Sequence, residues 1–527
     1  MASDAVQILE TLDNTRVTQK DYADVQWQYI FDQSQGSFLD SVQYITTILK
    51  PYFVDYHNAY IYLPIRVSSS TGVPYAGNEA IGFRDSILQL FKSMTITTDT
   101  GATIVNETMS PYFINMIRPR LENDFDFFEV NGGQLEMSRE IDNWLIRQNM
   151  VASVPNNGWS KQEYLYEATF DSITNATHGT NPMWNDPNAY LLGTSGSDTI
   201  ITNNNSYYNH TFANRIALFK SMTDFNGGYY DASLMIPLRY LHDFFNQLNI
   251  AVINLGFNIQ LYFSVTNGQS NSTTPLFMTN DGFNGGAAPP IITLGASRSG
   301  NQSSRLYYRS VKFDAADAAR MKEKLASNFT KSINFISTDY VNDRFTGSGK
   351  NIDKGTSSFF TNEITSSVVY PLRVWALAYP TPALRDPTAA GRWPLSVTPF
   401  HINNANILIN NVPYYKANLL WPQDHWEQIK QQFPNGQAAI RYDQYVRFNR
   451  WMCFDLQRLG LERITSPTEP VSLAIQGDLV VPPDASSATN SNVSMIYLVE
   501  RMNEITFRFS SSDVSVVVGN ISLNNTA

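Results

Sequence analysis

The sequence has little charge, a single cysteine and no long hydrophobic run. Aspartate, glutamate, lysine and arginine make up 16% of its 527 residues, against about 25% in typical soluble domains. Since apolar stretches such as Ile250–Val265 are interrupted by asparagine and glutamine, none is long enough to span a bilayer. Cys453 alone can form neither an intramolecular disulfide nor a multi-cysteine zinc site, and we expect it to be a small buried residue.

The sign of the charge excludes a second class of protein. The formal net charge is -10 and the isoelectric point is near 5.2, whereas a dedicated nucleic-acid binder needs clustered lysine and arginine to neutralise phosphates. With 43% hydrophobic residues the chain is not of the disordered class. Met1–Gln19 lacks the apolar centre of a secretory signal, so we do not expect export.

Alternation of apolar and polar residues dominates what is present. It is clear over residues 59–67, 257–265 and 505–509, where every second side chain is apolar. Such a period of two is typical of strands with one face buried. Because these stretches occur from the beginning to the end of the chain, the pattern predicts an all-β fold.

Helical spacing is rarer and loops are long. We expect short helices over Asp314–Ser327, Pro237–Leu248 and Pro422–Phe433, inserted between strands. Asparagine, glycine, serine, threonine and proline dominate three stretches, which we predict to be loops: Ile173–Thr211, Thr266–Ser304 and Pro482–Asn492. The middle loop lies just past the midpoint and is the best place for a domain boundary.

The two halves of the chain contain similar short motifs in the same order. Pro64–Val67 (PIRV) recurs as Pro371–Val374 (PLRV). Two weaker similarities follow in the same order. Val105-Asn106 with Pro111–Phe113 recurs as Ile409-Asn410 with Pro413–Tyr415, and Asn214-Arg215 with Phe219 recurs as Asn449-Arg450 with Phe454. The last interval is much longer in the first copy, which indicates a surface insertion there. Since proline lacks a strand donor, we expect Pro64 and Pro371 on edge strands or bulges.

No motif for catalysis, a cofactor or a metal is complete. Thr346–Asn351 resembles a phosphate loop but has Arg344 where the first glycine is required and Asn351 where serine or threonine is required. The histidines do not pair at helical spacing, so structural roles are favoured for all of them: His57, His178, His210, His242, His401 and His425. We therefore predict no catalytic, cofactor-binding or metal-binding residues.

Two charged stretches are interpreted as surface. Glu122, Asp124, Asp126 and Glu129 are interleaved with phenylalanines, which favours a strand or turn over a calcium site or a glycosidase acid pair. The basic stretch 305–331 has interleaved acids, which favours a solvated helix with i, i+3 ion pairs over a polyanion contact.

Several longer segments resemble one family. They resemble the close of the first jelly roll and parts of the second in double jelly-roll major capsid proteins, in particular those of polinton-like viruses and virophages: Ser233–Asn249 (SLMIPLRYLHDFFNQLN), Ile253–Phe263, Arg305–Phe313 (RLYYRSVKF), Ile407–Tyr415 (ILINNVPYY) and Asp424–Phe433 (DHWEQIKQQF). The resemblance extends over most of the chain, and its motifs are packing patterns.

The resemblance implies an all-β fold of two tandem eight-stranded jelly-roll barrels, a double jelly roll, with short inserted helices and long loops. Residues 1–38 would form an N-terminal arm, and residues 39–270 the first jelly roll with a long loop insertion at about 131–211. Residues 271–304 would be the linker and residues 305–527 the second jelly roll, which the resemblance opens at Arg305.

The resemblance also implies a function. It is that of a major capsid protein, a non-enzymatic structural protein without cofactors, whose homotrimer forms a pseudo-hexagonal capsomer that tiles the icosahedral capsid of a DNA virus. Its partners would be neighbouring capsomers and penton and minor capsid proteins, without direct specific contact to nucleic acid, and an internal membrane is left open. The location would be the capsid shell of the virion, after assembly inside the host cell.

Two other classes remain as alternatives. A carbohydrate-binding or glycoside-cleaving β-sandwich protein would also be rich in tryptophan, tyrosine and asparagine, and it would need exposed aromatic residues beside paired acids. A non-viral cytoplasmic scaffold is the other alternative. A trimer of hexagonal outline, rather than a monomer that binds glycans, would distinguish the capsid subunit from the first of them.

Overall fold

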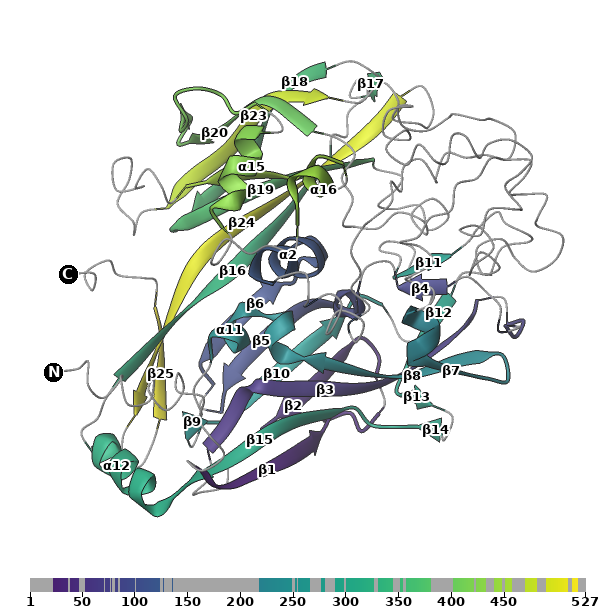
Figure 1. Ribbon diagram of the computed structural model, residues 1–527, viewed down its shortest axis with the longest axis vertical. Coiled ribbons are helices and arrows are strands. Elements are labelled where there is room, and N and C mark those ends of the chain that lie inside the picture. Colours follow the sequence, from purple (N-terminus) through teal and green to yellow (C-terminus); the bar gives the residue numbers. More distant parts are fainter. Residues whose placement is uncertain are drawn as a thin grey trace.

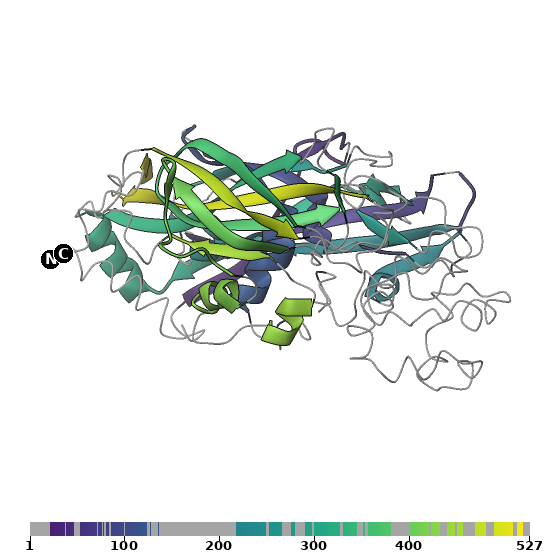
Figure 2. The ribbon, with the colours of Figure 1, turned by 90° about the horizontal axis from the view of Figure 1, so that it is seen from above.

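The computed structural model forms two β lobes, one above the other in Figure 1. In the view from above, the long strands of both lobes run along the length of the molecule (Figure 2). The structure describes residues 22–36, 38–46, 53–70, 72–75, 77, 81–83, 86–99, 101–123, 127, 135, 218–248, 252–253, 255–265, 276–279, 290–297, 300–326, 330–344, 351–353, 357–380, 401–420, 423–432, 440–447, 451–456, 470–480, 490–509 and 514–519.

The lower lobe consists of two main antiparallel sheets. One has the order β1-β15-β3-β8-β7, with β12 and β9 also paired to β3, and the other has the order β2-β10-β5-β6. The bounds are β1 Tyr22–Phe31, β2 Ser41–Ile45, β3 Phe53–Ser69, β5 Phe91–Thr98, β6 Thr103–Thr108, β7 Thr223–Asn226, β8 Tyr229–Pro237, β9 Val252–Ile253, β10 Phe257–Phe263, β12 Pro290–Leu294 and β15 Arg305–Phe313.

The upper lobe repeats this plan. One sheet has the order β16-β24-β19-β22, with β17 and β25 also paired to β24, and the other has the order β18-β23-β20-β21. The bounds are β16 Thr330–Arg344, β17 Asn351–Asp353, β18 Ser357–Val368, β19 Pro371–Pro380, β20 His401–Ile409, β21 Val412–Pro413, β22 Met452–Asp455, β23 Val471–Val480, β24 Asn490–Phe509 and β25 Val514–Gly519.

Both lobes have the strand order of a jelly roll. If the short extra strands are left aside, the first strand of each lobe pairs with the last, the last with the third and the third with the sixth. The second strand pairs with the seventh, the seventh with the fourth and the fourth with the fifth. The chain is therefore a double jelly roll, which confirms the expected all-β class. The two copies of Pro-x-Arg-Val lie in the third strand of each lobe, β3 and β19.

The boundary between the two jelly rolls differs from the expected one. β15 does not open the second jelly roll: it pairs with β1 from Tyr22↔Phe313 to Phe31↔Arg305 and also with β3, so it is the last strand of the first. β1 falls in the segment expected to be an arm, and β12 in the expected linker. Alternation identifies a strand but does not show which strand it pairs with, and here the partner lies hundreds of residues away. The predicted domain boundaries were therefore wrong. The predicted insertion at 131–211 lies outside the described residues except for Leu135.

The helices are short and mostly lie between strands. The predicted helix at Asp314–Ser327 is confirmed as α12, which joins the two jelly rolls, and that at Pro422–Phe433 as α15. The segment Pro237–Leu248 forms two helices, α10 and α11, because His242 has an extended backbone between them. The helical bounds are η1 Ile87–Leu90, η2 Phe113–Ile117, α2 Arg118–Glu122, α10 Leu238–Leu241, α11 Asp243–Gln247, α12 Ala315–Ala326, α15 Gln423–Lys430 and α16 Tyr442–Arg447. None of the helices in the described ranges could cross a membrane.

Two long strands connect the hydrophobic cores of the lobes. β16 and β24 pair along their length, from Thr330↔Arg508 to Arg344↔Ser494. One end of this ribbon contributes Phe335 and Phe507 to the core of the first jelly roll, and the other contributes Tyr497 to the core of the second. Figure 1 shows the ribbon running from the upper lobe down beside α11. The lobes therefore share continuous strands.

The sheets accommodate the two repeated prolines, which lack a backbone N–H donor, in different ways. Pro371 begins β19 with a register shift before Arg373, as expected for a bulge. Pro64 instead lies inside β3, which is an interior strand, so the edge prediction was wrong for it. On one side of β3, the neighbouring strand changes at Pro64. β15 pairs as far as Tyr62, and the pairing with β12 starts at Ile65. Proline is accommodated at this gap between partners.

Gly256, just before β10, allows a close backbone approach. A Cβ atom there would lie 2.2 Å from the carbonyl oxygen of Thr46, next to the hydrogen bond from the Thr46 amide to the Phe257 carbonyl. We expect Gly256→Ala to lower the free energy of unfolding by about 1–3 kcal/mol, because backbone cannot move aside as a side chain can. Chemical denaturation would measure this, with Gly101→Ala as a comparison: the Cβ there meets nothing within 4 Å but φ is +89°, so that variant reports backbone strain alone. A loss below about 0.5 kcal/mol for Gly256→Ala would contradict the steric explanation.

The small remaining strands form two short antiparallel pairs, and only the second of them is a hairpin. β4 (Ile81–Phe83) pairs with β11 (Phe277–Thr279), and β13 (Ala296–Ser297) pairs with β14 (Gly300–Asn301). The segment expected as a linker is therefore held against the first jelly roll at several points.

Candidate functional site: a charged junction and an aromatic face

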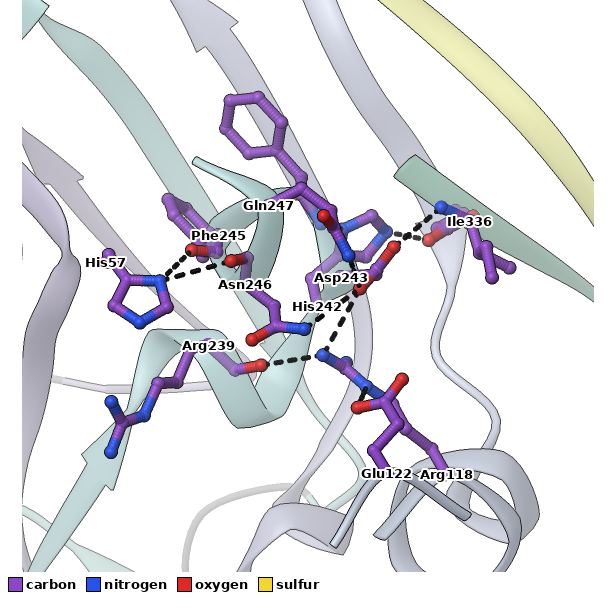
Figure 3. Close-up of polar contacts among 12 residues, drawn as sticks. His57, Arg118, Glu122, Arg239, His242, Asp243, Phe245, Asn246, Gln247 and Ile336 are labelled. Carbon is purple, nitrogen blue, oxygen red and sulfur yellow. Dashed lines mark hydrogen bonds and ion pairs between the residues drawn. The ribbon is translucent and has the colours of Figure 1, made fainter. Parts of the chain in front are cut away.

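The junction between the jelly rolls is built from charged residues on short helices of the first one. Asp243, the first residue of α11, accepts a hydrogen bond from the backbone N–H of Ile336 on β16, at 2.8 Å from Oδ2 (Figure 3). The other carboxylate oxygen lies 3.6 Å from Nη2 of Arg118 on α2. One carboxylate thus binds the backbone of the second jelly roll and a cation of the first.

Arg118 is held from three sides. Its Nε donates to Glu122 at 2.9 Å and its Nη2 donates to the carbonyl of Arg239 at 2.9 Å. The side chains of Arg118 and Asp243 are only 6% and 5% exposed. Burial lowers the pKa of the guanidinium, but the neighbouring Glu122 and Asp243 raise it by more. Arg118 therefore stays charged and neutralises the carboxylates around it.

His242 links the same helix to the first jelly roll and to the second. Its Nδ1 accepts the N–H of Phe244 at 3.0 Å and so caps α11. A neutral imidazole with this acceptor carries its proton on Nε2, which points to the carboxylate of Glu107 on β6. The ring packs edge-on against Phe335 of β16, with centroids 5.8 Å apart. The capping residue is thus also part of the contact between the lobes.

A second ion pair lies within the second jelly roll. Arg373 on β19 donates to Glu500 on β24 and to the side-chain oxygen of Gln432. Gln432 in turn donates to Asp455 at 3.1 Å. Burial raises the pKa of Glu500, and Arg373 offsets only part of that increase. Arg66, the equivalent residue of the first jelly roll, also forms an ion pair, with Asp231 at 2.6 Å.

Chemically, this junction holds the lobes together. Each acid named above binds a cation, an amide, an imidazole N–H or a backbone N–H. Among the residues that the structure describes, no group of three or more histidine, cysteine, aspartate and glutamate side chains could hold a metal ion. Of the acids considered from the sequence, Glu122 lies at this junction, while Asp124, Asp126 and Glu129 lie outside the described residues, as does most of the stretch Thr346–Asn351.

The histidines and the cysteine have structural positions where they are described. The Nδ1–H of His57 donates to the carbonyls of Phe245 and Asn246. His425 on α15 is buried and donates to the carbonyl of Cys453 at 3.2 Å. Cys453 is buried, as predicted, and burial raises the pKa of its thiol. His178 and His210 lie outside the described residues, and the side chain of His401 is not described.

The outer face of the β1-β15-β3-β8 sheet is aromatic. Its cross-strand rows are Trp27 with Arg309 and Asp55; Tyr29 with Tyr307, Tyr60 and Pro237; and Phe31 with Arg305, Tyr62 and Met235. We call this set the aromatic face. Trp27, Tyr29 and Phe31 are 54%, 49% and 48% exposed. Exposed apolar patches of this kind mark interaction sites.

The rings of the aromatic face contact one another and an arginine. Tyr60 and Tyr307 stack with centroids 5.1 Å apart, and Tyr29 packs against Tyr307 at 5.4 Å. The guanidinium of Arg305 lies between 5.2 and 5.8 Å from the ring centres of Tyr29, Phe31 and Tyr62. Such cation–π contacts hold the arginine without a carboxylate. The face is therefore preorganised.

The basic stretch at 305–331 is divided between this face and α12. Arg309 pairs with Asp55 at 3.6 Å, and Arg320 on α12 pairs with Asp317 at 3.4 Å, an i, i+3 pair on an exposed helix. The interpretation as a solvated helix with such a pair is confirmed.

Sequence reasoning missed both the junction and the aromatic face. Signals for the junction existed: Arg118 and Asp243 are charged residues in largely apolar surroundings, in the strings PYFINMIRPRL and LHDFF. A buried charge needs a partner, but nothing in either string indicates that these two residues meet. For the face, the alternating aromatics of β1 (WQYIF) were a signal of a strand whose outer side is apolar.

Comparisons with known proteins find similarity of structure without detectable similarity of sequence. No protein-family model matches the chain, and no curated protein matches it with significance. A chain in the cryo-EM structure of the Sputnik virophage is similar with a TM-score of 0.59 and 11% identity, over 98% of this chain and 93% of that one. The mavirus major capsid protein gives a TM-score of 0.47 at 10% identity, over 96% of this chain and 94% of the other. The first of these likenesses supports the double jelly-roll fold.

Proposed function

We propose that this protein is a major capsid protein, and that three copies form a pseudo-hexagonal capsomer that tiles the icosahedral shell of a DNA virus. The observation that carries the proposal is the likeness, over nearly the whole of both chains, to a chain of a virophage structure. That likeness spans both jelly rolls together, including their relative order. Further partners would be neighbouring capsomers, penton proteins and minor capsid proteins, in a shell assembled inside the host cell.

The composition suits a non-enzymatic tile. Asparagine outnumbers aspartate and glutamate together, which count 47, so much of the polar surface is uncharged. Identical subunits with few charges repel one another weakly, and amide and hydroxyl groups make many modest contacts that can break and form again during assembly. Two equivalent jelly rolls per chain would place six similar lobes in each trimer.

The alternative of a carbohydrate-binding or glycoside-cleaving protein has no support from the described residues. It requires exposed aromatic residues beside paired acids. The aromatic face instead surrounds Arg305, and the acid in its outer row, Asp55, is paired with Arg309. A likeness to a porphyranase from Bacteroides plebeius has a TM-score of 0.14 and is too weak to carry a function.

Purified protein would test the proposal directly. We expect light scattering after size-exclusion chromatography to give about three times 59.5 kDa, the mass of one chain, and negative-stain images to show particles of hexagonal outline. A monomer at all concentrations, with binding to a panel of oligosaccharides, would contradict the capsid proposal and favour the alternative.

A further inference from the structure

The aromatic face has an equivalent in the second jelly roll, and that equivalent is covered. In the second jelly roll the row across the same four strands is Tyr340, Leu498, Trp375 and Cys453. Leu498, Trp375 and Cys453 are fully buried. They alternate along their strands with core residues such as Val374 and Val499, so they point to the outer side of the sheet.

Part of that cover comes from the second jelly roll itself, where Trp451 packs against Trp375, and part comes from the first. Tyr112, which directly precedes η2, stacks on Tyr340 with ring centroids 6.1 Å apart and planes 12° apart. Arg118, six residues after Tyr112, lies 3.6 Å from Asp243 of α11, whose carboxylate accepts the N–H of Ile336 (Figure 3). Within one chain, therefore, the outer face of this sheet in one jelly roll packs against the segment that follows β6 in the other.

The first jelly roll leaves the matching positions open. Its corresponding row is Tyr29, Tyr307, Tyr60 and Pro237, and Tyr29 is half exposed. Arg305 adds a charge to the face, because its guanidinium lies over the rings of Tyr29, Phe31 and Tyr62. Backbone carbonyls of a partner would offer acceptors to its N–H groups.

We propose that the aromatic face binds the second jelly roll of another copy of this chain, through the segment Val412–Leu420 that contains and follows β21. The inference rests on the proposed capsomer and names its subunit contact. The motif Pro111–Phe113, which includes Tyr112, recurs at Pro413–Tyr415 in this segment. Tyr414, the counterpart of Tyr112, is buried in the core of its own jelly roll, so the contact would be made by the exposed residues around it. Val412 and Leu420 are apolar and 57% and 55% exposed, and the carbonyls of such a loop supply acceptors for Arg305.

The proposed contact between chains would repeat the contact between the two jelly rolls of one chain. The first jelly roll contributes to the cover of the second in its own chain, and the second would cover the first of the next chain. Such a head-to-tail contact uses two different surfaces of each copy and forms a ring when the rotation closes. Three copies would then give six jelly rolls in a ring, each with its aromatic or apolar sheet face covered by its neighbour.

Photo-crosslinking in the full-length protein tests which segment meets the face. Because Cys453 is fully buried, a maleimide-benzophenone label on Phe31→Cys reacts at one accessible site. Ile45→Cys is the matched control: Ile45 is 43% exposed and lies on β2, an edge strand of the opposite sheet. We expect the Phe31 label to crosslink two chains and to map to Val412–Leu420, and the Ile45 label not to reach that segment.

Charge substitution tests the same surface by affinity. We expect Phe31→Glu to weaken subunit association about 30-fold or more, as for loss of an interface hot spot, and Ile45→Glu to change it less than about threefold. Sedimentation velocity across a dilution series measures both. Because both positions are exposed, the variants should fold, and circular dichroism with a thermal scan checks that they do.

The possible outcomes separate this inference from the capsid proposal. If the wild type forms trimers but Phe31→Glu assembles as well as Ile45→Glu, or if the Phe31 label maps to its own chain or to another segment, the contact is wrong and the capsomer stands. If the wild type is a monomer at every concentration, both fail. An intermolecular crosslink to Val412–Leu420, together with selective weakening by Phe31→Glu, supports the contact.

Discussion

Replacing Arg118 with methionine is expected to lower the free energy of unfolding by about 3–5 kcal/mol. The substitution keeps most of the apolar side chain but leaves Asp243, which is 5% exposed, as a buried carboxylate without its cation. Breaking a buried pair by removing one partner has this cost because the remaining charge stays desolvated. Denaturant titration followed by tryptophan fluorescence measures the loss.

Two further variants show whether charge is the cause. Arg320→Met removes an arginine from the exposed pair with Asp317 on α12, where the arginine side chain is 70% exposed, and it should cost less than about 1 kcal/mol. The double variant Arg118→Met with Asp243→Asn removes both buried charges and should recover part of the stability lost by Arg118→Met alone. If the double variant is less stable by the sum of two independent losses, the pairing explanation fails.

The second large effect is a pH dependence from His425. Burial lowers the pKa of this imidazole from 6.5 to about 4. Below pH 6.5 the unfolded chain takes up a proton that the folded chain does not, so the stability from the neutral buried ring is present above pH 6.5. It is lost as the pH falls towards 4, by about 3 kcal/mol in all.

The variant His425→Gln keeps a donor for the carbonyl of Cys453 but cannot titrate. We expect the difference in unfolding free energy between wild type and this variant to shrink by about 3 kcal/mol between pH 7 and pH 4, as measured by denaturant titrations at each pH. His57→Gln is the control, since that imidazole also donates to backbone carbonyls but is partly exposed. A difference for His425→Gln that stays constant with pH would show that the ring is not kept neutral by burial.

Glu500 contributes a dependence of the opposite sign. Burial raises its pKa in the folded state, so its contribution is fully present below its ordinary value of 4.5 and is lost as the pH rises through the folded value. The wild-type profile therefore combines opposing contributions, and the comparison of each variant with wild type isolates the contribution of His425.

Much of the local structure could be predicted from residue patterns. Alternation identified β3 and β10, because a half-buried strand alternates in whatever sheet it occupies. The repeated Pro-x-Arg-Val motif indicated two copies of one topology, and both copies lie in the third strand of their jelly rolls. The helix break at His242 was not predicted, because apolar spacing through Pro237–Leu248 continues across it.

The sequence by itself determined the all-β class, the duplication and the scarcity of charge, since these depend on which residues are present and on their spacing along the chain. Only the tertiary structure decided that β15 belongs to the first jelly roll, that Arg118 and Asp243 meet, and that the aromatic face is open while its counterpart is covered. Each of these is a relation between residues more than a hundred positions apart, and no local pattern encodes which distant surfaces come into contact.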